Sequence, residues 1–202
     1  MKRLLERLLE RRAEALARRI SPFLANCDSV LDIGCGTGHN AAALRALRPR
    51  LLVYEADVVD MKVLGDPPML IHQAVLPFPK DRFDCGLLLF VLHYPSDPLP
   101  LLREAHRVIS SRLLVLQSTW GDALSRWLLR GREWIQGAAA FYVARRAGLI
   151  RPCLCPLRPA RLMDRPHLED LFRTSGWTVR RRQEQGWPST RLSRDLYVLE
   201  KT

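Results

Sequence analysis

Residues 30–40 read Val30-Leu31-Asp32-Ile33-Gly34-Cys35-Gly36-Thr37-Gly38-His39-Asn40, a short apolar run followed by three glycines at every second position. Glycine has no Cβ, so a backbone this rich in glycine can turn tightly and approach a ligand closely. A helical pattern follows, and the first amides of a helix carry partial positive charge that suits an anionic or carboxylate group. The stretch therefore predicts a ligand-binding loop between a buried strand and a helix.

Outward from this loop, strand-like and helix-like segments alternate along the chain. Apolar runs predict strands at residues 29–33, 51–54, 69–71, 83–90, 112–117, 177–183 and 196–200. Apolar residues at spacings of three and four predict helices at residues 1–24, 40–47, 99–109, 120–149 and 166–175. Alternation of this kind favours a doubly wound α/β fold with a mostly parallel sheet.

Length and composition predict a single globular domain. The chain has 202 residues, of which 48% are hydrophobic and 26% are charged, a balance that disordered chains lack. It holds no apolar run of about twenty residues, and its first twenty residues carry charges throughout, which excludes a spanning helix and a secretory signal. Five cysteines, an odd number, do not make a disulfide framework. We therefore expect a reducing, cytoplasmic setting.

The net charge of +11 is concentrated in the second half, where sixteen lysines and arginines follow residue 118 against eight acidic residues. A positive surface favours nucleic acid, anionic lipid or an acidic substrate. An arginine-rich coding bias explains the same numbers, since arginine outnumbers lysine 28 to 4. The leading helix is cationic and amphipathic, so it either packs on the domain or rests on a membrane surface.

The spacing of the glycines separates two classes of cofactor. Dinucleotide-binding loops space their glycines G-x-G-x-x-G, whereas this loop reads G-x-G-x-G and follows Asp32. A carboxylate suits an ammonium group better than a pyrophosphate. S-adenosylmethionine carries an ammonium group and a sulfonium and has no phosphate. Charge and spacing both favour that cofactor.

Several motifs then match one family. They are Val30–Gly38, Leu76-Pro77-Phe78 with Arg82-Phe83-Asp84, Val91-Leu92-His93-Tyr94, and Glu104-Ala105-His106-Arg107-Val108. With these motifs the chain resembles class I S-adenosylmethionine-dependent methyltransferases, in particular the ubiquinone/menaquinone-type group. The resemblance implies a Rossmann-like fold with a seven-stranded sheet, an antiparallel C-terminal hairpin and a helical insertion after strand five. It divides the chain into an N-terminal helix (1–24), a cofactor-binding core (25–118), an insertion that covers the substrate (119–163) and a C-terminal helix with its hairpin (164–202).

The same resemblance implies which residues bind S-adenosylmethionine. Asp57 would accept hydrogen bonds from the ribose hydroxyls, with Glu55 as the competing carboxylate and capping of a following helix as the alternative role of Asp57. Val58 would contact the adenine, and His72 and Gln73 stand where the family usually has an aspartate for the adenine amino group. The complete set of expected cofactor residues is Asp32, Gly34, Cys35, Gly36, Gly38, Asp57, Val58, His72, Gln73 and Phe90.

Methyl transfer from a sulfonium is an in-line displacement that needs mainly alignment and exclusion of water. His93 is the candidate catalytic base, because it follows the fourth strand at the ligand end of the sheet; its alternative role is to shape the pocket. Aromatic residues of the insertion (Trp120, Trp127, Trp134, Phe141 and Tyr142) form either a lid over a hydrophobic substrate or the core of a helical pair. The expected substrate is a small, largely hydrophobic metabolite that is quinone-, pigment- or lipid-like.

Two other functions stay open. One is a nucleic-acid methyltransferase that uses the basic C-terminal half, although the chain lacks the Asn/Asp-Pro-Pro-aromatic motif and any recognisable RNA-binding module. The other is a methyltransferase-like protein without catalysis that acts in assembly or regulation. Cys153 and Cys155 have no second pair of cysteines nearby, so we expect no metal site. The sequence leaves the oligomeric state open.

Overall fold

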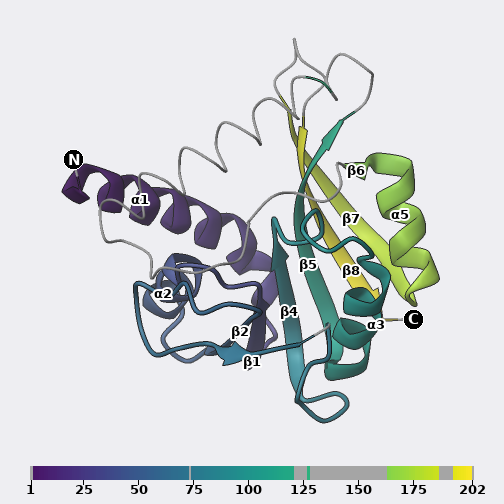
Figure 1. Ribbon diagram of the computed structural model, residues 1–202, viewed down its shortest axis with the longest axis horizontal. Helices are drawn as coiled ribbons and strands as arrows, with labels where there is room; N and C mark the ends of the chain where they lie inside the picture. The colour runs from purple at the N-terminus through teal and green to yellow at the C-terminus, as the bar shows by residue number, and fades with distance from the viewer. Residues whose placement is uncertain (1, 73, 121–126, 128–162, 187–192, 202) are drawn as a thin grey trace.

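A computed structural model describes residues 2–72, 74–120, 127, 163–186 and 193–201 (Figure 1). One sheet runs through this part of the chain in the order β3-β2-β1-β4-β5-β8-β7, and β6 pairs with β5. The strands are β1 (Ser29–Ile33), β2 (Leu52–Asp57), β3 (Met69–Leu70), β4 (Phe83–Leu89), β5 (Ile109–Trp120), β6 (Met163–Asp164), β7 (Trp177–Gly186) and β8 (Ser193–Lys201). β1 to β6 pair in parallel, and β8 is antiparallel to both β5 and β7.

This arrangement confirms the mostly parallel sheet and the antiparallel C-terminal hairpin. All seven predicted strands begin within three residues of their observed starts; β5 differs most, because it begins three residues earlier than predicted and ends three later. The two residues of β6 are an addition that the apolar pattern did not predict. The predicted helix at 120–149 lies outside the described residues, apart from its two positions Trp120 and Trp127.

The helices lie on the two faces of the sheet (Figure 1). They are α1 (Lys2–Ile20), the 3-10 helix η1 (Ser21–Leu24), α2 (His39–Leu47), α3 (Leu99–Val108) and α5 (Arg165–Thr174). Alternate residues of a strand point to opposite faces, and the core divides accordingly. Leu113 and Val115 join the cluster that packs under α3 and α5, whereas Leu114 and Leu116 join the cluster under α1 and α2. Both faces of the sheet are therefore covered, as its apolar strands require.

Helix boundaries follow local chemistry. The predicted helix 1–24 divides after Ile20, where Pro22 enters the 3-10 turn of η1. At α5, Oδ1 of Asp164 accepts a hydrogen bond from the amide of His167 (2.8 Å), which makes Asp164 the N-cap. Gly176 follows that helix with φ +86°, a left-handed conformation that glycine adopts without a steric penalty. No described helix is long and apolar enough to cross a bilayer.

Two of the sequence motifs meet in space and are structural. The amide of Leu76 donates to Oε2 of Glu104 (3.0 Å), and the Arg107 guanidinium donates to the carbonyls of Leu76 and Phe78 (2.8 Å each). Glu104 and Arg107 also pair with each other on α3 at 2.7 Å. The Leu-Pro-Phe segment before β4 is thereby fixed to the helix before β5.

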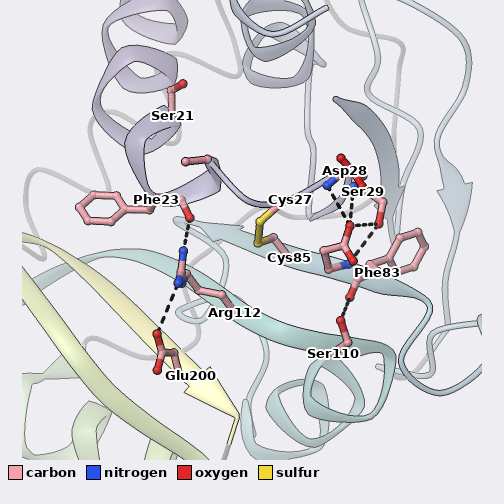
Figure 2. The surroundings of a disulfide bond; sticks show 12 residues. Ser21, Phe23, Cys27, Asp28, Ser29, Phe83, Cys85, Ser110, Arg112 and Glu200 are labelled. Carbon is pink, nitrogen blue, oxygen red and sulfur yellow. Dashed lines mark hydrogen bonds and ion pairs between the residues drawn. A yellow bond between two sulfur atoms is a disulfide. The ribbon is translucent and has the colours of Figure 1, made fainter. Parts of the chain in front are cut away.

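The cysteines differ from expectation, because Cys27 and Cys85 form a disulfide (Figure 2). Their separation of 58 residues hides the pairing in the sequence, but β1 lies beside β4 with Val30 opposite Cys85. That register brings Cys27, just before β1, next to Cys85. The prediction of cysteines without a disulfide is therefore wrong for this pair. Disulfides persist mainly in oxidising compartments, so the cytoplasmic setting stays a prediction without support from the cysteines.

Polar contacts around the disulfide attach the N-terminal segment to the sheet (Figure 2). The Asp84 carboxylate accepts hydrogen bonds from the amides of Asp28 (2.9 Å) and Ser29 (2.8 Å) and from the Ser29 hydroxyl (2.9 Å). On the neighbouring strand, Arg112 donates to the carbonyl of Phe23 (2.6 Å). The end of η1 and the start of β1 are therefore held against β4 and β5.

Candidate functional site

The glycine-rich loop lies between β1 and α2, as predicted. Gly34, Gly36 and Gly38 have φ of +77°, +55° and +81°, which disfavours any residue with a Cβ. A Cβ on Gly34 would lie 2.5 Å from Cγ2 of Val91, in the segment after β4. A Cβ on Gly36, by contrast, would meet nothing within 4 Å. The loop is closed against the protein at Gly34 and open at Gly36, so Gly36 is where a ligand can approach the backbone.

Asp57 ends β2 beside this open position. Its Oδ2 accepts from the amide of Gly36 (2.8 Å), and its Oδ1 accepts from the amide of Val58 (2.7 Å). Burial raises the pKa of Asp57, and these backbone hydrogen bonds oppose the rise. Residues 58–68 contain no helix, which removes helix capping as the alternative role for Asp57. Its carboxylate is fixed at the edge of the loop.

Asp32 lies in β1 with 1% of its surface exposed. Within the described part of the chain, neither carboxylate oxygen of Asp32 has a hydrogen-bond partner. Burial raises the pKa of Asp32 to about 7, and the negative charges of Glu55 and Asp57 add to the rise. A buried carboxylate without partners is costly, which marks Asp32 as a group suited to a cationic ligand.

Glu55, the competing carboxylate, is occupied by two cations. Its Oε1 lies 2.5 Å from Nζ of Lys62, and its Oε2 lies 2.8 Å from the Arg45 guanidinium on α2. The side chains of Lys62 and Glu55 are 3% and 7% exposed. We call Asp32, Glu55, Asp57 and Lys62 the acidic cluster. With Glu55 engaged in this way, Asp57 is the better candidate for a ligand contact.

Lys62 is a residue that the sequence analysis missed. It stands in an irregular segment without a motif, so no pattern indicated that its ammonium is buried. Its aliphatic chain passes over Gly38, where a Cβ would lie 2.9 Å from Cε of Lys62. The amides of Val63 and Leu64 donate to the carbonyl of Thr37 at 3.1 and 3.4 Å. The segment after β2 is thereby attached to the glycine-rich loop.

His93 follows β4 and is 6% exposed. Its Nδ1 lies 3.0 Å from Nε2 of Gln117 on β5, and its ring contacts the tilted ring of Tyr94 with 4.2 Å between centroids. An amide nitrogen only donates, so Nδ1 accepts this bond and the proton of a neutral His93 is on Nε2. Gln117 was not predicted, because a glutamine inside an apolar strand gives no motif. It fixes the orientation of the His93 ring.

The remaining expected residues lie in different surroundings. Cys35 is buried, and burial raises the pKa of its thiol. Val58 and His72 are exposed near the end of β2 and after β3, and Gln73 lies outside the described residues. Phe90 is half-buried and packs on the side of the sheet that α1 covers. No ligand contact tests these assignments, so they stay predictions.

A groove of about 370 Å³ opens between α1 and α2, with the carboxylates of Glu10 and Glu14 on its α1 side. His39, the first residue of α2, also lines it. Nδ1 of His39 lies 2.9 Å from the Thr37 hydroxyl, and burial lowers the pKa of the ring. The groove therefore adjoins the glycine-rich loop on the face opposite α3.

Comparisons with known proteins agree with this geometry. Residues 1–181 match the family model of a methyltransferase domain. Magnesium protoporphyrin IX methyltransferase from Synechocystis PCC 6803, solved with bound SAH, is 17% identical with a TM-score of 0.59, over 96% of this chain and 83% of that one. The 1,6-didemethyltoxoflavin-N1-methyltransferase from Burkholderia thailandensis, solved with 1,6-didemethyltoxoflavin and S-adenosylhomocysteine, is 19% identical with a TM-score of 0.59, over 96% and 78%.

The fold is shared with a further enzyme, the cyclase SpnF, at 15% identity and a TM-score of 0.64, over 93% of this chain and 80% of that one. A search of curated proteins finds no significant match. The ubiquinone/menaquinone-type group stays a prediction. The extent of the family match and the sheet topology together show that the chain belongs to the methyltransferase domain family and has the fold of S-adenosylmethionine-dependent methyltransferases.

Proposed function

We propose that this protein binds S-adenosylmethionine and transfers its methyl group to a small, largely hydrophobic metabolite. The observation that carries the proposal is Asp32, a buried carboxylate without a hydrogen-bond partner among the described residues, placed at the start of the glycine-rich loop. An ammonium group supplies the partner that Asp32 lacks, and a buried ion pair is far less costly than a lone buried charge. The residues present therefore fit the cofactor.

Other residues of the loop fit the rest of the cofactor. Asp57 would accept the ribose hydroxyls, since a carboxylate has room for such donors beside its backbone contacts. The open side of Gly36 lets the nucleoside approach the backbone. Val58 and His72 would lie on the adenine side, because they follow the carboxyl ends of β2 and β3.

The cofactor supplies an electrophilic methyl group on a sulfonium, so the protein has to align the acceptor and exclude water. His93 stands at the carboxyl end of β4, with Gln117 bound to its Nδ1. In this tautomer His93 presents an N–H to the acceptor, which holds an acceptor oxygen in place. To take a proton from the acceptor, Nε2 of His93 would have to be unprotonated, as it is in the other tautomer. In the tautomer that Gln117 favours, His93 positions the acceptor and does not act as a base.

The proposed substrate class is supported by the small molecules of the similar proteins. The similar proteins named above act on magnesium protoporphyrin IX or hold 1,6-didemethyltoxoflavin, both of them small molecules. Quinone-, pigment- and lipid-like acceptors share an extended apolar body. Of the aromatic residues expected to cover such an acceptor, Trp134, Phe141 and Tyr142 lie outside the described part of the chain.

Calorimetry with S-adenosylmethionine and S-adenosylhomocysteine tests the proposal. We expect both to bind the wild-type protein, and we expect Asp57→Ala to weaken both by roughly tenfold or more, because hydrogen bonds to charged groups contribute about 1.5–3 kcal/mol. Arg173→Ala is the matched control, since Arg173 is an exposed residue of α5 paired with Asp170. If neither compound binds the wild-type protein, the chain is a methyltransferase-like scaffold and the proposal is wrong.

A further inference from the structure

Gln117, on β5, has a side-chain amide of which only one end is bonded. The residue is 2% exposed, and its Nε2 donates to Nδ1 of His93 at 3.0 Å. Its carbonyl oxygen, Oε1, is buried and has no hydrogen-bond partner among the residues that the structure describes. Burying such a group without a partner is unfavourable, and most buried polar groups of folded proteins have one. Orientation of the His93 ring needs the NH2 group alone, so it does not explain the buried oxygen.

The protein does supply donors to the neighbouring buried acceptor. Asp195 on β8 stands opposite Gln117 in the register of the two strands, so the two side chains share one face of the sheet. Oδ2 of the buried Asp195 accepts from the Thr119 hydroxyl and from Nε of Arg165, both at 2.9 Å. Asp195 cannot satisfy Gln117 in turn, because a carboxylate oxygen and an amide oxygen are both acceptors. Of these two acceptors, the described part of the chain supplies donors to Asp195 and none to Oε1 of Gln117.

Gln117 stands where the row of core residues along β5 ends. Val115 and Leu113, two and four positions earlier, point to the same face and belong to the apolar cluster under α3 and α5. β4 pairs with β5 as far as Leu116, and β6 pairs with β5 from Thr119 onward. Gln117 therefore follows the carboxyl end of β4, and ligands of parallel α/β sheets bind at that end of the strands. An apolar residue would continue the core at this position, whereas the amide places an acceptor there.

The turn after β4 connects this amide to the glycine-rich loop. Val91 lies against Gly34 of the loop, and two residues later His93 contacts Gln117. The turn is closed by the amide of Tyr94, which donates to the carbonyl of Val91 (3.0 Å). One turn of chain thus reaches the glycine-rich loop on one side and the Gln117 amide on the other. A methyl acceptor that meets a cofactor bound at the loop has to lie near this turn.

We propose that Oε1 of Gln117 accepts a hydrogen bond from an N–H or O–H group of the methyl acceptor. This inference rests on the proposed function and narrows its substrate class to apolar molecules that carry a hydrogen-bond donor. A site with a buried acceptor discriminates strongly, because a ligand without the donor leaves the oxygen unpaired. Gln117 is then a specificity-determining residue that contacts the acceptor, in addition to orienting His93.

Matched pairs of small aromatic molecules test the contact without knowledge of the substrate. Phenol and anisole differ by a methyl group in place of the O–H hydrogen, and indole and 1-methylindole differ in the same way at the N–H. Each compound is titrated into the 15N-labelled protein in saturating S-adenosylhomocysteine and followed through the backbone amides of residues 93 and 117. We expect at least one donor to bind roughly tenfold more tightly than its methylated partner.

Substitutions separate this contact from a structural role. Gln117→Met removes the oxygen and should bring the ratio of the two dissociation constants close to one; Gln117→Leu repeats the test with a second apolar side chain. Gln117→Glu keeps a carboxyl oxygen and should retain the preference. The matched control is Gln183→Met, which should leave the ratio unchanged, because Gln183 stands opposite Leu196 on the face that α1 and α2 cover. Damage to packing alone would weaken both members of a pair and leave their ratio unchanged.

Each outcome decides the question. A preference for phenol, for indole or for both, lost in Gln117→Met, supports the contact and identifies the donor. Equal binding within both pairs by the wild-type protein overturns it, because the oxygen then holds an internal water or nothing. Absence of binding by all four compounds also overturns it. So does a preference that survives in Gln117→Met, or one that is lost in Gln117→Glu as well.

Failure of this inference is distinguishable from failure of the proposed function. Calorimetry measures the binding of S-adenosylhomocysteine before the titrations begin. Absence of that binding would overturn the proposed function and this inference with it. Normal binding of S-adenosylhomocysteine without a preference that depends on Gln117 would overturn this inference alone.

Discussion

Two charged groups on the same face of the sheet carry opposite charge, yet the protein holds them in different ways. One is the acidic cluster. The other, the Phe90 pair, consists of Arg12 on α1 and Arg194 on β8, whose guanidinium carbons lie 5.6 and 5.9 Å from the ring centroid of Phe90. The cluster is buried, and Lys62 and Arg45 offset the charge of Glu55. In the Phe90 pair, Arg12 is exposed and rests on an aromatic ring. Buried charges interact in a low dielectric and exposed ones are screened by water. Changes in the cluster should therefore alter both stability and binding, whereas a change at Arg12 should leave stability almost unchanged.

The largest expected effect comes from Lys62→Met, which leaves Glu55 buried with one cation fewer. Breaking a buried ion pair by removing one partner typically costs 3–5 kcal/mol. Because Arg45 remains beside Glu55, we expect the lower end, a loss of about 3 kcal/mol in the free energy of unfolding. Urea denaturation followed by circular dichroism measures it.

Two further variants make this measurement a test of the comparison. Lys62→Met combined with Glu55→Gln should recover most of the loss, since no unpaired charge stays buried. Arg12→Met removes the same unit of charge from the Phe90 pair and should change the free energy of unfolding by about 0.5 kcal/mol or less. An equal loss in Lys62→Met and Arg12→Met would show that burial does not separate the two regions.

Asp32→Asn should produce a smaller effect with opposite signs on stability and binding. Because the folded pKa of Asp32 is raised to about 7, its ionised form destabilises the fold. This penalty is fully present above pH 7 and vanishes below the ordinary carboxyl range near pH 4. At pH 8 we expect the variant to be more stable by roughly 1–3 kcal/mol and to bind S-adenosylmethionine roughly tenfold to a hundredfold more weakly.

Denaturation at pH 8 and calorimetry at the same pH measure both quantities. A gain in stability together with a loss of affinity is typical of a residue kept for function at the expense of stability. If Asp32→Asn loses stability at pH 8, the carboxylate has a structural role in the cofactor-free protein. If affinity is unchanged, Asp32 does not contact the cofactor.

The sequence predicted the acidic cluster better than the Phe90 pair, for a physical reason. Asp32 and Asp57 stand at the ends of apolar strands next to a glycine pattern, so their place at the carboxyl edge of a parallel sheet follows from local periodicity. Arg12 and Arg194 are 182 positions apart in a chain with 28 arginines. Only the packing of α1 over the sheet and the antiparallel register of β8 bring them to one ring.

The same distinction explains the other differences. The parallel strands were predictable because each buries a continuous apolar run. Cys27 and Cys85, Lys62 and Gln117 act through partners that are distant in the sequence, and none of them stands in a pattern with a period. Local chemistry predicts elements and loop types, whereas pairings between elements need the topology.

The smallest expected effect is the pH dependence of cofactor affinity. The cofactor's ammonium should favour the ionised form of Asp32 and so lower its pKa. Lys62 and Arg45 act in the same direction, whereas burial, Glu55 and Asp57 raise that pKa. Affinity for S-adenosylmethionine should therefore rise by roughly tenfold or less between pH 5.5 and pH 7.5, below the range in which α-amino groups lose their proton.

Calorimetry at pH 6.5 in two buffers of different ionisation enthalpy should also detect proton release from Asp32 on binding. The dependence should disappear in Asp32→Asn. S-adenosylhomocysteine retains the ammonium group but lacks the sulfonium, so equal slopes for the two compounds would place Asp32 at the ammonium group. A slope for S-adenosylmethionine alone would place it at the sulfonium, and a flat profile for both would contradict the contact.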